Sequence, residues 1–213
     1  MLFHLINFKS PPKNNFFAPE WNYHLIESTI KDINCLSLSK FLKNKEKKIL
    51  KLKAGTDGYT GLGKNSVTSR HHSYNLFDFK NKEISKLKKN ILALHKIFLK
   101  QFSLTYKTLF IKGWYNILRK NEEIKPHLHG TGPDIYLGGH FCVQCNNTST
   151  YYINPVNQLN DPMLHKSQNK IGKLTLFQNC IPHYTDIHKS NDERITIAFD
   201  LMLTQCKQTY RKL

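Results

Sequence analysis

Hydrophobic and polar positions follow two different periods in the two parts of the chain. Up to about residue 105, apolar side chains recur every three or four positions, which is the spacing of an amphipathic helix. From about residue 106 they form short runs, separated by turns rich in Gly, Asn, Asp and Pro, as β-strands do. Helices followed by short strands predict a mainly β, α+β protein: a jelly roll, or double-stranded β-helix, with an N-terminal helical layer.

The N-terminal part is predicted to hold one strand and three helices. The first eight residues, MLFHLINF, alternate like a strand and end at the turn-like SPPKNN. Helical spacing predicts helices over 20–34, 38–52 and 82–102. The third pattern is the clearest, and its apolar face consists of Ile84, Leu87, Ile91, Leu94 and Phe98. We expect these helices to cover a sheet.

The C-terminal part is predicted to hold five strands, over 106–119, 136–145, 149–155, 172–179 and 193–203. In the last strand one face is wholly apolar, whereas the other carries Arg194, Thr196 and Ala198. A small-residue face with one arginine suits the wall of a ligand cavity. An inward guanidinium needs an anionic partner, most simply a carboxylate held by two hydrogen bonds.

The pattern contains no internal repeat and no linker. We therefore predict one domain over 1–213, in which 1–105 supplies a strand and helices that support a barrel, and 106–204 forms the double-stranded β-helix itself. No apolar run reaches the length of a membrane span, and the N-terminus lacks the features of a secretory signal. Five cysteines, an odd number, then favour reduced thiols in the cytoplasm.

The net charge of +17 raises the question of a nucleic-acid partner. Of the 32 basic residues 28 are Lys, and the chain also holds 20 Asn, a mixture that an AT-rich genome produces without selection for binding. The lysines are spread along the chain, and the runs at 43–53 and 86–90 fit solvated helix faces. Nucleic acid is therefore not the favoured partner, although the charge mildly favours an anionic or macromolecular substrate.

The segment KPHLHG, residues 125–130, carries the candidate metal chemistry. In extended chain, residues two apart point the same way, so His127 and His129 would present two imidazoles to one space. Such a pair is common by chance and can equally face water. A third histidine, His183, follows a strand and a proline, and Arg194 opens the final strand shortly after it. Whether these residues meet depends on the fold.

The order of these motifs resembles the iron(II)- and 2-oxoglutarate-dependent oxygenases, in particular a bacterial and phage branch of them. The matching pieces are GWYNI (113–117), HLH (127–129), LGGHFCV (137–143), GKLTLF (172–177), PH (182–183) and RITIAFD (194–200). The upstream segment 57–79, which contains TSRHHSYN, is similar to the same branch, so the resemblance spans about 57–203. Each motif is weak alone, and their order makes the match specific.

The resemblance implies a double-stranded β-helix that holds Fe(II) and uses 2-oxoglutarate and O₂ as co-substrates. The family couples decarboxylation of 2-oxoglutarate to succinate with oxidation of a C–H bond, usually as a hydroxylase. By position, Arg194 would bind the distal carboxylate of 2-oxoglutarate, and Thr196 would add a hydroxyl hydrogen bond. The prime substrate does not follow from the fold.

This chain departs from the family pattern at the metal. Most members place an Asp or Glu two residues after the first histidine, whereas this chain has His129. The implied ligands are then His127, His129 and His183, a set of imidazoles that suits iron but lacks one negative charge. The alternative is that Asp134 supplies the carboxylate ligand. In that case, one of the two neighbouring histidines does not bind the metal itself but contacts a residue that does.

Further residues are candidates for the pocket. Asn116 lies in the W-x-N-I motif, and His140 shares a strand face with Cys142. Each can line the cavity, or it can be an ordinary strand residue with a purely structural role. In the 57–79 segment, Arg70 and Tyr74 could reach the cavity mouth, whereas His71 and His72 are expected to be exposed.

Two other kinds of protein stay open. One is a cupin-like jelly roll that binds a metal through three histidines without 2-oxoglutarate, which would give the inward Arg194 no function. The other is a basic nucleic-acid-binding or interaction protein on a degenerate barrel, which would bind DNA or RNA in a salt-sensitive way and need no iron.

Overall fold

The structure is a computed structural model that describes residues 1–9, 22–105, 108–130, 135–155, 164–204 and 210–213. The described elements are β1 (Phe3–Lys9), β2 (Asn22–Thr29), α1 (Cys35–Leu50), the short 3₁₀ helices η1 (Thr68–Arg70) and η2 (Leu76–Asp78), α2 (Lys82–Lys100), β3 (Phe110–Leu118), β4 (Ile135–Gln144), β5 (Ser149–Ile153), β6 (Leu164–Gln168), β7 (Lys173–Gln178), β8 (His183–Thr185), β9 (Arg194–Met202) and β10 (Arg211–Lys212).

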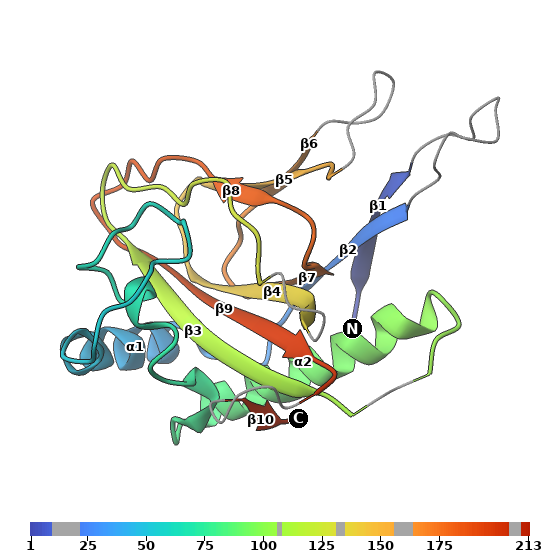
Figure 1. Cartoon of the computed structure of the whole chain (residues 1–213), viewed down its shortest axis with the longest axis horizontal. Helices are drawn as coiled ribbons and strands as arrows, with labels where there is room; N and C mark the ends of the chain where they lie inside the picture. Colours follow the sequence, from blue (N-terminus) through green and yellow to red (C-terminus); the bar gives the residue numbers. More distant parts are fainter. Residues whose placement is uncertain (10–21, 106–107, 131–134, 156–163, 205–209) are drawn as a thin grey trace.

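The strands form two antiparallel sheets. The larger has seven strands in the order β1-β2-β7-β4-β9-β3-β10, and the smaller has three in the order β6-β5-β8. Figure 1 shows the small sheet above the large one, with both helices below. The protein is thus mainly β with a jelly-roll core, as predicted from the sequence.

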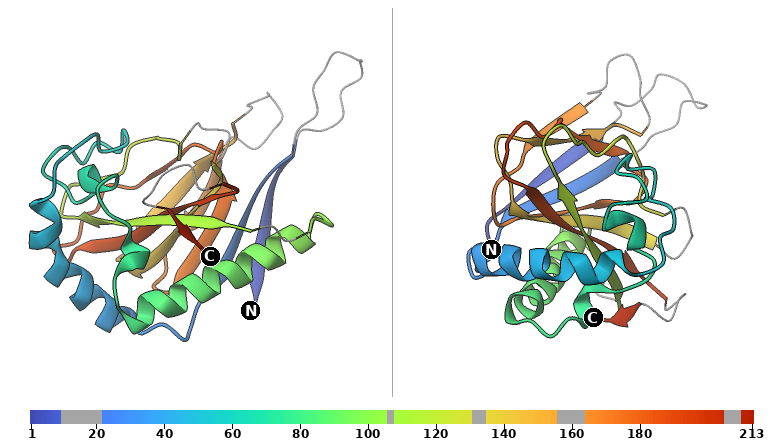
Figure 2. Two further views of the ribbon diagram at one scale, coloured as in Figure 1. Left: turned by 60° about the horizontal axis from the view of Figure 1, so that its bottom comes forward. Right: turned by 90° about the vertical axis from the view of Figure 1, so that its left-hand side faces the viewer.

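The helices cover the outer face of the large sheet (Figure 2). Each begins at an asparagine that caps it: Asn34 accepts a hydrogen bond from the N–H of Ser37, and Asn81 accepts from the N–H groups of Glu83 and Ile84. The predicted apolar face of α2 is buried in the main hydrophobic core. There it meets the apolar face of β9, so both predicted faces are confirmed. Neither α1 nor α2 combines the length and the apolarity that crossing a membrane requires.

The helix predicted over 20–34 is wrong, because residues 22–29 form strand β2 and residues 30–34 form a turn that leads to α1. This strand lies between β1 and β7 and is buried on both faces. Ile26 packs into the main core, whereas Leu25 packs between the two sheets. A strand buried on both faces loses its strict alternation, so the apolar residues here mimic helical spacing. Pairing with two neighbours decided the structure.

The five strands predicted in the C-terminal part all form, as β3, β4, β5, β7 and β9. Sequence periodicity did not reveal β6, β8 and β10, which have five, three and two residues. These are too short for an alternating pattern to stand out. One of them, β8, begins at His183, so its position matters for the site.

Candidate metal centre

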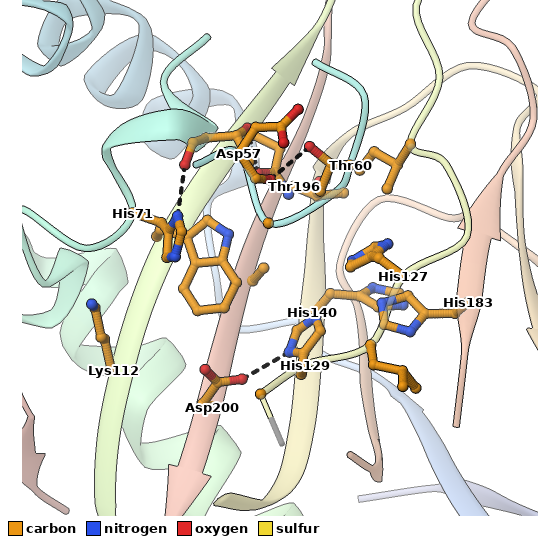
Figure 3. Close-up of a pocket in the computed structure, with 18 of the residues that line it drawn as sticks. Asp57, Thr60, His71, Lys112, His127, His129, His140, His183, Thr196 and Asp200 are labelled. Atoms are coloured by element: carbon orange, nitrogen blue, oxygen red, sulfur yellow. Dashed lines mark hydrogen bonds and ion pairs between the residues drawn. The ribbon is translucent and has the colours of Figure 1, made fainter. Parts of the chain in front are cut away.

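A cavity of about 230 Å³ opens between the inner face of the large sheet and the small sheet. All three candidate histidines line it, together with Arg194 and Thr196. The segment 57–72 supplies part of its mouth, including Asp57, Thr60 and His71 (Figure 3). The cavity is therefore built from segments that are far apart in the sequence.

The backbone brings the first and third histidines together. His127 and His183 exchange two backbone hydrogen bonds, both 3.1 Å long, in an isolated antiparallel bridge. This bridge places their ring centroids 4.4 Å apart, and the ring of His129 lies 5.0 Å from that of His183. One ligand nitrogen from each of the three residues lies within 4.8 Å of the others. The predicted histidines thus converge on one point of the cavity (Figure 3).

Hydrogen bonds determine which ring nitrogen each histidine offers. The Nδ1 of His127 is 2.8 Å from the carbonyl of Lys125, and the Nδ1 of His183 is 3.2 Å from the carbonyl of Ile181. Because a carbonyl can only accept, each Nδ1 must donate its proton. The lone pair of each neutral ring is then on Nε2, which is the nitrogen left for a metal.

The cavity also favours the neutral form of two of these rings. Burial, with the neighbouring His129 adding to the effect, lowers the pKa of His127 to about 4. Burial likewise holds the pKa of His183 well below its usual value, with His127 and His129 adding to the effect. A histidine must be neutral to bind a metal, so both are ready to bind at physiological pH.

A carboxylate supports the third histidine. Asp200 on β9 accepts a hydrogen bond from the Nδ1 of His129 at 2.8 Å, and both side chains are buried (Figure 3). This is the arrangement in which a carboxylate orients a metal-bound imidazole and makes it more basic. Gly138 on β4 makes room for this ring and for that of Phe177, since a Cβ at that position would lie 2.9 Å from the Nδ1 of His129 and 2.8 Å from the Phe177 ring.

The other end of the cavity holds an unusual cation. Arg194 is only 2% exposed, and its Nε and Nη1 have no hydrogen-bond partner among the residues that the structure describes. A buried donor without a partner costs free energy, more so on a charged group. Thr196, two residues further along the same strand face, lines the cavity beside it. This end is therefore suited to a carboxylate.

The remaining predicted residues lie as follows. Asn116 lines the cavity and accepts a hydrogen bond from Thr68 at 2.8 Å. His140 also lines it, with its Nε2 2.6 Å from the hydroxyl of Tyr152. Asp134, the alternative ligand, lies outside the described residues.

The predictions for the 57–79 segment need correction. His71 is half-buried rather than exposed, whereas His72 is exposed as predicted, and both line the cavity. Arg70 instead binds backbone carbonyls, including those of Leu50 and Ser66, and holds the loop in place. The hydroxyl of the buried Tyr74 accepts from the N–H of Tyr115. Neither Arg70 nor Tyr74 is part of the cavity wall.

Sequence reasoning missed three charged residues of the cavity, Asp57, Lys112 and Asp200. Lys112 and Asp200 continue a period-two pattern that could have revealed them. Asp200 follows Arg194, Thr196 and Ala198 on the inner face of β9, and Lys112 shares its face with Asn116 on β3.

Comparisons with known proteins agree on the fold. No protein-family model and no curated protein matches the sequence. Among solved structures, the chain is similar to a viral collagen prolyl hydroxylase from Paramecium bursaria chlorella virus-1, solved with 2-oxoglutarate: TM-score 0.51, 14% identity, covering 85% of this chain and 96% of that one. It is also similar to the α-ketoglutarate-dependent epimerase SnoN of nogalamycin biosynthesis: TM-score 0.55, 9% identity, covering 84% and 78%.

A third similar structure is an oxidoreductase of the 2OG-Fe(II) oxygenase family from Burkholderia pseudomallei, with a TM-score of 0.46 and 15% identity. The match covers 62% of this chain and spans 64%, just under two thirds, of that protein. Together with the two sheets described above, the first two of these comparisons show that the chain shares the jelly-roll fold of the viral hydroxylase and of SnoN.

Proposed function

We propose that this protein is an iron(II)- and 2-oxoglutarate-dependent dioxygenase that oxidises a C–H bond of its substrate, most simply as a hydroxylase. One observation carries the proposal: three imidazoles converge at one point of a cavity whose far end holds the buried, unsatisfied guanidinium of Arg194. A metal-binding jelly roll without 2-oxoglutarate gives that guanidinium no partner.

The residues present fit the implied groups. Three imidazoles suit a first-row ion such as iron(II), and His127, His129 and His183 would hold it. The free donors of Arg194, with the hydroxyl of Thr196, would bind the distal carboxylate of 2-oxoglutarate. When bound, iron and 2-oxoglutarate would supply the oxidising chemistry with O₂, in which 2-oxoglutarate is converted to succinate and CO₂.

The chain's own contribution is to position these groups. The bridge between His127 and His183 fixes two rings through the backbone, and Asp200 fixes the third. Burial of Arg194 excludes water from the guanidinium, which strengthens its interaction with a carboxylate. The co-substrate would thereby be held in one orientation relative to the metal.

The test is formation of succinate from 2-oxoglutarate by the purified full chain with Fe(II) in air, compared among variants. His183→Ala should abolish the reaction because it removes a ligand, whereas His165→Ala, on β6 outside the cavity, should not. Arg194→Ala should raise the 2-oxoglutarate concentration needed by at least tenfold while metal binding stays intact. Arg119→Ala, which removes an exposed guanidinium, is the matched control. If Arg194→Ala binds 2-oxoglutarate as well as the parent, the proposed role of Arg194 is wrong.

A further inference from the structure

His140, on the inner face of β4, is a buried histidine outside the group of three that converges on the metal centre. It is 7% exposed and lines the cavity together with Arg194 and Thr196 (Figure 3). Its Nδ1 has no hydrogen-bond partner among the residues that the structure describes. A buried polar group without a partner costs free energy, so a ligand that supplies the partner would gain affinity from this residue.

The register of the large sheet places His140 between the two ends of the cavity. His140 lies opposite Ala198 on β9. On the inner face of that strand, Ala198 is four positions from Arg194 and two positions from Asp200, which supports the metal end. A molecule that extends from the metal to the guanidinium therefore passes His140.

The tautomer of His140 follows from its other nitrogen, because the Nε2 lies 2.6 Å from the hydroxyl of Tyr152. Burial holds the pKa of Tyr152 well above its usual value. It holds the pKa of His140 well below its usual value, and the nearby charge of Arg194 adds to this effect, so both groups are neutral. A phenol is a stronger acid than a neutral imidazole, and the imidazole is the stronger base, so the hydroxyl donates and Nε2 accepts. The one proton of the ring is then on Nδ1, which is a donor.

The donors at this end of the cavity match what one carboxylate can accept. A carboxylate has two oxygens with about four lone-pair sites. Arg194 offers its Nε and Nη1, Thr196 offers a hydroxyl, and His140 offers its Nδ1–H. In the proposed function, Arg194 and Thr196 would bind the distal carboxylate of 2-oxoglutarate. The imidazole would complete this set without adding a second positive charge.

We propose that His140 is a positioning residue for the co-substrate. Its Nδ1–H donates a hydrogen bond to the distal carboxylate of 2-oxoglutarate, beside Arg194, and so favours a 2-oxo diacid over 2-oxo acids that lack this carboxylate. The inference rests on the proposed function, because it needs a co-substrate that extends from the metal to Arg194. Tyr152 contributes indirectly, since its hydroxyl keeps Nε2 an acceptor and thereby keeps the proton on Nδ1.

Two substitutions separate the roles of the two ring nitrogens. The side-chain amide of Asn takes the place of Nδ1, whereas that of Gln reaches the place of Nε2. His140→Asn therefore keeps a donor for the co-substrate but loses the contact with Tyr152, and His140→Gln keeps that contact but loses the donor. A purely structural role through Tyr152 makes the Asn variant the more impaired of the two, whereas the positioning role makes it the Gln variant.

Anaerobic calorimetric titration of the iron-loaded full chain with 2-oxoglutarate measures the difference. We expect His140→Gln to bind 2-oxoglutarate at least tenfold more weakly than the parent, since a charge-assisted hydrogen bond is lost, and His140→Asn to stay within about threefold of the parent. The affinity for Fe(II) should be equal in all three proteins. His4→Gln, which replaces an exposed histidine on β1, is the matched control and should bind like the parent.

A second ligand separates the distal carboxylate from the metal. 2-Oxopentanoate has a methyl group in place of that carboxylate, so it should bind the parent more weakly than 2-oxoglutarate does, and His140→Gln should bind it as the parent does. The inference is wrong if His140→Gln binds 2-oxoglutarate like the parent, if His140→Asn loses as much affinity as His140→Gln, or if the parent binds both acids equally well.

The parent alone gives an answer if neither variant folds. In nitrogen-15 NMR of the zinc-loaded, histidine-labelled chain, 2-oxoglutarate but not 2-oxopentanoate should slow the solvent exchange of one additional histidine Nδ1–H. No such difference between the two acids would overturn the role of His140.

The same titration distinguishes the two proposals. If the parent binds 2-oxoglutarate but the affinity does not depend on the donor at position 140, only the role of His140 is wrong. If the iron-loaded parent does not bind 2-oxoglutarate, the proposed function itself is wrong.

Discussion

Asp200 contacts the Nδ1 of His129, so it supports this imidazole and does not take its place. In most proteins of the family that the motifs resemble, a carboxylate occupies the position of His129 and binds the metal directly. Here the imidazole takes that position, and the buried carboxylate contacts its Nδ1 at 2.8 Å. In the proposed site, the negative charge would thus lie one hydrogen bond further from the metal, where it could still polarise the ring.

Asp200→Asn should therefore weaken metal binding without removing a ligand. The amide keeps the shape of the side chain but loses the charge, so we expect the affinity for Fe(II) to fall by about 10- to 100-fold. Anaerobic metal titration by calorimetry measures this effect. Asp32→Asn, which neutralises an exposed carboxylate, should match the parent. Equal affinities in the Asp200→Asn variant and the parent would rule out this role of Asp200.

Part of the site could be predicted from single residues. The motif HLH, His183 and Arg194 were identifiable because each stands in a recognisable local pattern, and the structure brings all of them to one cavity. The contact between His129 and Asp200 could not be predicted, since it joins positions 71 apart through tertiary packing. That Asp200 and Lys112 face the cavity could have been predicted, because each lies an even number of positions from a strand residue already assigned to that face.

At the scale of elements, two consecutive glycines of β4 leave room for neighbouring rings on both sides of the sheet. Side chains added at Gly138 and Gly139 would point to opposite faces. A Cβ on Gly138 would approach the rings of Phe177 and His129 on the cavity side, whereas a Cβ on Gly139 would approach the Phe199 ring in the helix-covered core and the carbonyl of Thr175. The two positions form a natural pair of test sites.

Gly138→Ala should impair the metal site more than the fold, and Gly139→Ala should do the opposite. In the first variant the new methyl must displace the His129 ring or the Phe177 ring, which packs against both His129 and His183, so we expect at least a tenfold loss of Fe(II) affinity. In the second it strains the core, by about 1–3 kcal/mol of unfolding free energy. Metal titration and urea unfolding of both variants separate the effects. If both variants lose stability equally and bind metal equally, β4 does not control the His129 ring.

The elements also show where periodicity succeeds and fails. Helix α2 was predictable because it buries one continuous apolar face, and β9 because its apolar residues alternate with cavity-lining ones although both of its faces are buried. Strand β2 was mistaken for a helix because it is buried on both faces, and β8 was missed because it has three residues. In both cases pairing with distant strands, which the local sequence does not contain, determined the structure.

At the scale of the whole molecule, buried histidines make the stability depend on pH. His95 on α2 is fully buried, where its Nε2 contacts the hydroxyl of Tyr136, and burial lowers its pKa to about 4. Between pH 6.5 and about 4, the unfolded chain binds a proton at this position and the folded protein does not. The folded protein must therefore lose stability as the pH falls through this window.

In this pH window, one such histidine makes the unfolding free energy fall by about 1.4 kcal/mol for each unit by which the pH decreases. His95→Gln keeps an acceptor for Tyr136 but does not titrate, so the unfolding free energy of this variant should fall less steeply between pH 6.5 and 4. Urea unfolding of metal-free protein across this range measures both slopes. Identical slopes in the parent and the variant would show that His95 is not held neutral by the fold.

The central claim is that the three imidazoles and Arg194 together hold iron(II) and 2-oxoglutarate. Its most direct test is anaerobic visible absorption during titration of the iron-loaded protein with 2-oxoglutarate. The account predicts a weak metal-to-ligand charge-transfer band that saturates at one co-substrate per chain and is absent in His183→Ala. An iron-loaded parent that shows no such band at any 2-oxoglutarate concentration would contradict it.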